Sequence, residues 1–209
     1  RDPELANLSK GFVINVMSQA EASKIPLLTF KDFFEDPVRY DPWKSWEKAL
    51  GTVGGASHFD ALKRFSENAL YSCLDYGQEE PLKRLSSEAL DALKSGEKAT
   101  ESPKVQALYT YLDSLDEAGY ELKFRMSNYA LRQNLYPWIE LMESAAWAGR
   151  RAIQLLRTME AEEDTAAILN WLNESAREVT HHPKRLARSL TPLIDYALSM
   201  VKEDRGCIL

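Results

Sequence analysis

Asn15 is the residue of this chain with the strongest case for binding chemistry. It follows the short apolar run Phe12-Val13-Ile14 and comes before a polar turn. A carboxamide offers N–H donors and an oxygen acceptor on one side chain, which suits a sugar whose adjacent hydroxyls both donate and accept. The alternative is that Asn15 only caps its own turn at the end of a strand, a common role for asparagine.

Adjacent acidic residues could act as a general acid and a general base, but their positions in this chain favour another role. Glu79-Glu80, Glu162-Glu163-Asp164 and Glu203-Asp204 fall at predicted helix ends or polar links. Carboxylates at such places cap helices or remain solvated. We therefore assign no catalytic role to these residues.

Two further clusters have the right residue types for binding but the wrong spacing. His181 and His182 are neighbours in sequence, so they would not face the same way on a helix. No Cys, His or carboxylate partner stands at ligand spacing from them, and we predict no metal site and no cofactor. Lys184, Arg185 and Arg188 are best explained as a solvated basic face.

The elements around Asn15 predict half of a β/α unit. Residues 11–14 have the pattern of a buried strand, and the predicted helix over residues 23–34 has Ser23 as its N-cap and Pro26 in its first turn. A lone strand cannot satisfy its own backbone groups. It must pair with strands outside this sequence, or lie frayed. In a barrel of such units, ligand-contacting residues sit where the strands end.

The rest of the chain shows helical periodicity. Asp41 is predicted as the N-cap of a second helix with Pro42 at its first position. One long helix is predicted to start at Pro103 and to include Tyr129, and a new one to begin near Pro137. The remaining apolar stripes predict helices over residues 59–76, 80–95, 165–179 and 186–201. Long helices with short polar links predict an antiparallel bundle.

The tryptophans divide into two predicted roles. Trp138 lies on an apolar seam and is expected in the core, whereas Trp147 falls off that seam and is the best candidate for an exposed contact. Trp43 and Trp46 follow the barrel-like segment and are expected to anchor the bundle against a barrel.

The first fifty residues resemble the end of the catalytic barrel in glycoside hydrolase family 84, the β-N-acetylglucosaminidases that include bacterial O-GlcNAcases and so-called hyaluronidases. The shared run is N-V-M-S-Q-A-E-A-S-K-I-P-L, followed by T-F-K-D-F and P-x-x-Y-D-P-x-x-S-W. About a dozen positions at fixed spacing make this motif specific. The close match covers residues 2–50. Val16 stands where the family usually has proline, so no ring constrains the backbone just after Asn15.

The resemblance implies a role for Asn15 and a reaction for the family. It implies that Asn15 hydrogen-bonds outer hydroxyls of a terminal N-acetylglucosamine. It also implies substrate-assisted hydrolysis, in which the acetamido oxygen of the sugar attacks the anomeric carbon and no protein nucleophile is needed. In the family, an Asp-Asp pair on an earlier strand provides the general acid and base. That pair is missing here, so the isolated chain is expected to show no turnover.

Composition excludes some classes of partner. The net charge of −6 argues against nucleic-acid binding, which requires a basic face. No stretch approaches the roughly 20 apolar residues of a membrane span. Cys73 and Cys207 are expected to be free thiols, although the sequence cannot show whether they pair. The sequence does not distinguish a secreted from a cytoplasmic protein, and the resemblance is to enzymes of bacterial type.

The predicted fold is therefore mainly α, an antiparallel helical bundle preceded by the last β/α unit of a (β/α)8 barrel. We place the end of the barrel at residues 1–36 and the helical bundle domain at residues 37–209. The expected partners are an N-terminal catalytic barrel of the same enzyme and an N-acetylglucosaminyl glycan or glycoprotein. The rival hypothesis is a non-catalytic helical module that binds another protein.

Overall fold

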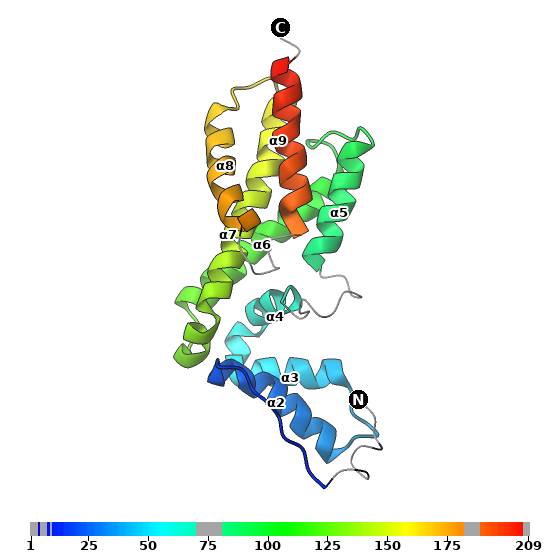
Figure 1. Ribbon diagram of the computed structural model, residues 1–209, viewed down its shortest axis with the longest axis vertical. Helices are drawn as coiled ribbons and strands as arrows, with labels where there is room; N and C mark the ends of the chain where they lie inside the picture. The colour runs from blue at the N-terminus through cyan, green and yellow to red at the C-terminus, as the bar shows by residue number, and fades with distance from the viewer. Residues whose placement is uncertain (1–3, 5–7, 9, 70–80, 182–188, 207–209) are drawn as a thin grey trace. The chain divides into compact units, whose positions relative to one another are not determined.

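The regular elements of this protein are helices throughout the part that the structure describes. The computed structural model describes residues 4, 8, 10–69, 81–181 and 189–206. The elements are α2 (Ala20–Glu35), α3 (Pro42–Gly54), the 3-10 turn η1 (Ala56–His58), α4 (Phe59–Glu67), α5 (Pro81–Lys94), α6 (Pro103–Phe124), α7 (Tyr129–Glu160), α8 (Ala166–His181) and α9 (Thr191–Gly206) (Figure 1). The predicted mainly helical fold is confirmed.

The chain divides into two compact units. The first unit is Arg1–Lys63 with Glu121–Pro137, and the second unit is Arg64–Tyr120 with Trp138–Leu209. These units are defined by packing alone. The predicted boundary near residue 36 concerns the barrel of a longer enzyme, and it remains a prediction.

The predicted strand over residues 11–14 is not formed. Residues 11–17 have no regular secondary structure, and the side chains of Phe12 and Val13 are exposed. A strand is stable only when its backbone groups bond to a neighbouring strand. The described residues include no other strand that could pair with this segment. The β part of the predicted β/α unit is therefore corrected to an extended irregular segment in this chain.

In the first unit, α2 and α3 form an antiparallel pair and lie side by side (Figure 1). Asp32 on α2 accepts hydrogen bonds from the hydroxyl of Ser45 at 2.8 Å and from Nζ of Lys48 at 3.0 Å on α3. Phe33 and Leu50 are buried in the same unit. The start of α3 is as predicted, because Oδ1 of Asp41 accepts from the backbone N–H groups of its first turn.

Two other predicted helix starts are wrong. α2 begins at Ala20 rather than after Ser23, and Pro26 therefore lies inside the helix. α6 ends at Phe124, and α7 begins at Tyr129 with Pro137 in its interior. In both cases an asparagine caps the observed start: Asn134 caps α2 and Asn128 caps α7.

In the second unit, α6 and α7 run antiparallel. Trp147 on α7 is hydrogen-bonded to Asp116 on α6. Arg157, which comes later in α7, is hydrogen-bonded to Gln106, which comes earlier in α6. Gly149 lets them approach closely, since a Cβ at this position would stand 2.8 Å from Cδ1 of Leu112. Side chains of α6 and α7 supply much of the core; fully buried ones include Leu108, Leu112, Leu115, Ile139, Met142, Ile153 and Leu155.

Within the described residues, no helix is both long enough and apolar enough to cross a membrane.

Candidate functional site

The side chain of Asn15 is exposed and forms no hydrogen bond with any other described residue. It does not cap its own turn. No other described residue therefore occupies its N–H donors or its oxygen acceptor.

The segment that holds Asn15 is attached to α2 on both sides of this residue. On the N-terminal side, the ring of Phe12 packs against that of Phe34, with 4.7 Å between the ring centroids. On the C-terminal side, the backbone N–H of Met17 donates to the hydroxyl oxygen of Ser23 at 3.1 Å. The Ser23 hydroxyl donates in turn to the carbonyl of Gln19 at 2.9 Å. Asn15 therefore lies between two fixed points.

Ser23 has a different role from the predicted one. It is 2% exposed and lies within α2, where its hydroxyl holds the chain that precedes the helix. Its neighbour Ala22 is also buried. The E-A-S part of the motif thus combines two small buried residues, Ala22 and Ser23, with Glu21, whose side chain points to other partners.

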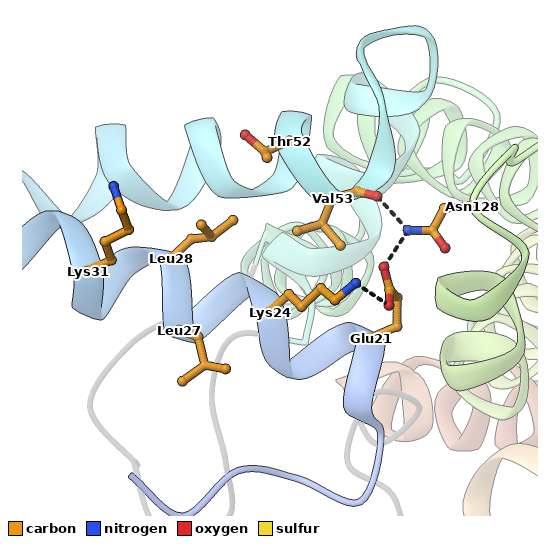
Figure 2. Close-up of a pocket in the computed structure, with 8 residues that line it drawn as sticks. All are labelled: Glu21, Lys24, Leu27, Leu28, Lys31, Thr52, Val53 and Asn128. Carbon is orange, nitrogen blue, oxygen red and sulfur yellow. Dashed lines mark hydrogen bonds and ion pairs between the residues drawn. The ribbon is translucent and has the colours of Figure 1, made fainter. Parts of the chain in front are cut away.

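Glu21 joins three elements of the first unit. Its carboxylate accepts from Nζ of Lys24 at 2.6 Å and from Nδ2 of Asn128 at 2.9 Å, and Nδ2 of Asn128 also donates to the carbonyl of Val53 at 2.8 Å (Figure 2). The hydrogen bonds from Lys24 and from Asn128 hold the pKa of Glu21 below its ordinary value of 4.5. The start of α2, the end of α3 and the start of α7 are thereby connected.

A groove of about 460 Å³ lies beside this connection, between α2 and α3. It is lined by Glu21, Lys24, Leu27, Leu28, Lys31, Thr52, Val53 and Asn128 (Figure 2). Its two lysines form ion pairs, Lys24 with Glu21 and Lys31 with Glu35 at 2.8 Å. Ion pairing with Glu35 raises the pKa of Lys31. These paired cations favour a supporting role for the groove over a catalytic one.

Among the acidic pairs of the sequence, the structure shows a local structural role for Asp164. Asp164 accepts from the backbone N–H of Ala166 at 2.9 Å at the start of α8, as expected of a capping carboxylate. Glu79 and Glu80 lie outside the described residues, as do Cys73, Cys207, His182 and the basic cluster 184–188. In the described part of the chain, no group of three or more His, Cys, Asp or Glu side chains could hold a metal ion.

Trp147 is exposed, as predicted, with 44% of its surface accessible. Its indole N–H donates to Oδ1 of Asp116 at 2.8 Å. Arg150 joins the same network, and its guanidinium bonds to both Asp113 and Asp116. Burial lowers the pKa of Arg150, but its bonds to Asp113 and Asp116 outweigh this and raise it overall.

Two residues of the site were missed at the sequence level, Asn128 and Asn134. Asn128 had a local signal, because an asparagine directly before Tyr129-Ala130-Leu131 is a typical N-cap. Asn134 had none, because the helix start that it caps lies 112 to 113 residues earlier in the chain.

Fold and site together define a helical protein whose N-terminal motif is fixed to its first helix and presents an asparagine to solvent. Residues 1–67 match the family model of β-N-acetylglucosaminidase. The resemblance to glycoside hydrolase family 84, predicted from residues 2–50, is thereby confirmed for this part of the chain.

Solved structures share the fold of almost the whole chain. A mutant of the O-GlcNAc hydrolase of Thermobaculum terrenum is 22% identical, with a TM-score of 0.77 over 99% of this chain and 45% of that one. A protein described as CpGH84B is 21% identical, with a TM-score of 0.77 over 94% of this chain and 35% of its own. This chain therefore spans less than half the length of either structure.

Proposed function

We propose that this chain is the C-terminal portion of a retaining β-N-acetylglucosaminidase of family 84. In this proposal, Asn15 binds hydroxyls of a terminal N-acetylglucosamine, and residues 37–209 form a helical domain that supports the catalytic barrel. The observation on which it depends is the family-model match over residues 1–67, the stretch that contains Asn15.

Two structural features support the assignment of Asn15. Its carboxamide is exposed and has no partner among the described residues. The segment around it is fixed at Phe12 and at Met17. A binding side chain held in advance loses less conformational entropy when the ligand arrives.

The remaining surface of this segment suits a barrel as its neighbour. Phe12, Val13, Val16 and Met17 are all exposed apolar residues. Their backbone groups are free of ladder hydrogen bonds, so a sheet edge supplied by the preceding part of the enzyme could pair with them. The domain boundary near residue 36 and the barrel as a partner both follow from this proposal.

The chemistry would be substrate-assisted. The acetamido oxygen of the sugar attacks the anomeric carbon while a general acid protonates the departing glycosidic oxygen, and water then opens the resulting ring with net retention. The acid and base would come from the barrel. This chain would bind and orient the terminal sugar, which is positioning rather than bond making.

The test uses the longer enzyme that contains this chain, assayed on an aryl N-acetylglucosaminide. Replacing Asn15 with alanine removes one or two hydrogen bonds to the sugar, each worth about 0.5–1.5 kcal/mol. We expect kcat/KM to fall about 10-fold for N15A. The 209-residue chain on its own should show no turnover.

The matched control is N173A, because Asn173 is an exposed asparagine on α8, in the second unit. It should leave kcat/KM within twofold of the parent. Enzyme-like rates from the isolated chain, or an N15A enzyme that equals N173A, would refute the proposal. A chain that instead forms a stable dimer through the exposed apolar segment 12–17 would favour the rival interaction module.

A further inference from the structure

The first turn of α2 takes its hydrogen-bond acceptor from a distant part of the chain. Gln19 precedes the helix but its side chain caps nothing. Instead, Oδ1 of Asn134 accepts from the backbone N–H of Glu21 at 2.9 Å and from that of Ala22 at 3.3 Å. The first N–H groups of any helix lack partners within the helix, so an acceptor here determines where the helix starts.

Asn128 provides the second link from α7 to the same helix start. Its oxygen accepts from the backbone N–H of Leu131 at 3.0 Å, which caps α7. Its nitrogen donates to the Glu21 carboxylate and to the carbonyl of Val53 (Figure 2). One carboxamide thus fixes the first turn of α7 relative to both α2 and α3. All of these residues belong to the first unit.

The path from this start to Asn15 is short and is hydrogen-bonded. Ser23 is buried, and its hydroxyl accepts from the N–H of Met17 and donates to the carbonyl of Gln19. Any rotation or fraying of the first turn of α2 would move Ser23. Met17 would follow, and Asn15 is only two residues away.

We propose that Asn128 and Asn134 are positioning residues for sugar binding by Asn15. They hold the start of α2, and thereby the segment 15–19, in one conformation before the substrate arrives. This inference depends on the proposed function, because it takes Asn15 to be a sugar ligand. It assigns a role in binding to the first two turns of α7, which lie outside the barrel-like motif.

A purely structural role would give a different result. Loss of a helix cap lowers stability but by itself changes neither the KM nor the kcat of the enzyme that remains folded. A positioning role predicts that KM rises while kcat stays nearly constant, since Asn15 contacts hydroxyls remote from the reacting bond. The split between KM and kcat therefore separates the two roles.

Three variants make the test specific. N134A removes the acceptor for the α2 N–H groups, whereas N134D keeps an oxygen in the same place and a negative charge that suits a helix start. N128S keeps an oxygen that can cap α7 but removes the Nδ2 group that donates to both Glu21 and Val53. If N134A does not fold, N128S still tests the proposal, because the cap of α7 is retained.

The first measurement is amide hydrogen exchange of the 209-residue chain. N134A and N128S should speed exchange of residues 17–23 about 10-fold, while residues 108–115 of α6 keep the parent rate. N134D should restore slow exchange in residues 17–23. Unchanged exchange in these residues in both N134A and N128S would overturn the proposal.

The second measurement is steady-state hydrolysis of an aryl N-acetylglucosaminide by the longer enzyme. N134A and N128S should raise KM about 3- to 10-fold with kcat within twofold, and N134D should return KM to near the parent value. Faster exchange with an unchanged KM would overturn the positioning role. If N15A itself leaves KM unchanged, it is the proposed function that fails, whatever the exchange data show.

Discussion

Single hydrogen-bonding side chains determine the geometry around Asn15. Ser23 is the clearest case, because a hydroxyl with both donor and acceptor capacity fills a buried position next to two backbone groups. Alanine would fit the same space but would leave those groups without this partner. The serine of the motif is therefore explained by structure, whereas sugar binding by Asn15 is a proposal.

S23A is expected to lower the free energy of unfolding by about 1–2 kcal/mol, because it leaves the Met17 N–H without an acceptor in a part-buried place. Urea denaturation followed by circular dichroism at pH 7 measures this change. S18A is the matched control: the Ser18 hydroxyl is exposed and, among the described residues, bonds only to the side chain of Gln19. It should change stability by less than about 0.5 kcal/mol. Equal effects of the two variants would contradict this account of Ser23.

At the scale of elements, helix starts differ in whether the residue that caps them is near or distant in the sequence. The start of α3 was predicted because Asp41 caps its own first turn two and three residues later. The start of α2 was predicted at the wrong residue because its acceptor, Asn134, comes from α7. Pro137 favours a helix start eight residues too late, because proline is common at the first position of a helix, whereas the true cap is Asn128.

The α2–α3 pair should respond to acid through Asp32. Hydrogen bonds from Lys48 and Ser45 hold the pKa of Asp32 below its ordinary value of 3.8. A carboxylate with a lowered pKa in the folded state stabilises the fold above its unfolded pKa, and this contribution is lost as the pH falls through the folded value. We expect the melting temperature to fall between pH 5 and pH 3, and to fall less in D32N.

Thermal melts of the parent and of D32N across this pH range provide the measurement. The two proteins should differ most near pH 6 and converge toward pH 2. D91N serves as the control, since Asp91 is exposed on α5 and has no ion pair with another described residue. A constant gap between the parent and D32N at every pH would show that Asp32 stabilises the pair by some other means.

At the scale of the whole molecule, close helix packing is what makes the second unit compact. Small residues on α7, such as Ala145, Ala148 and Ala152, are buried. Gly149 marks the tightest place, because an added Cβ would lie 2.8 Å from Leu112 and 3.1 Å from Leu190. Both leucines are fully buried, so they have little room to move.

G149A is expected to destabilise the chain by about 1–2 kcal/mol, because overpacking outweighs the gain of up to about 1 kcal/mol in helix propensity. G51A is the matched control. Gly51 is also inside a helix, but its added Cβ would meet only Phe59 at an ordinary 3.7 Å. G51A should therefore be neutral or stabilising. Urea denaturation of both variants measures these changes in stability. A G149A protein more stable than the parent would contradict the expectation and would show that Leu112 and Leu190 can shift to make room for the added methyl group.

The sequence by itself determined that this protein is helical, where α3 starts, that Trp147 is exposed, and that the first fifty residues resemble the β-N-acetylglucosaminidases, whose family model they match. Each of these depends on periodicity, a local cap or a continuous motif. Only the tertiary structure decided that residues 11–14 form no strand here and that Asn128 and Asn134 hold the start of α2. The physical reason is the same in both cases. The backbone groups of a strand and of the first turn of a helix need partners, and those partners come from chain that is distant in sequence.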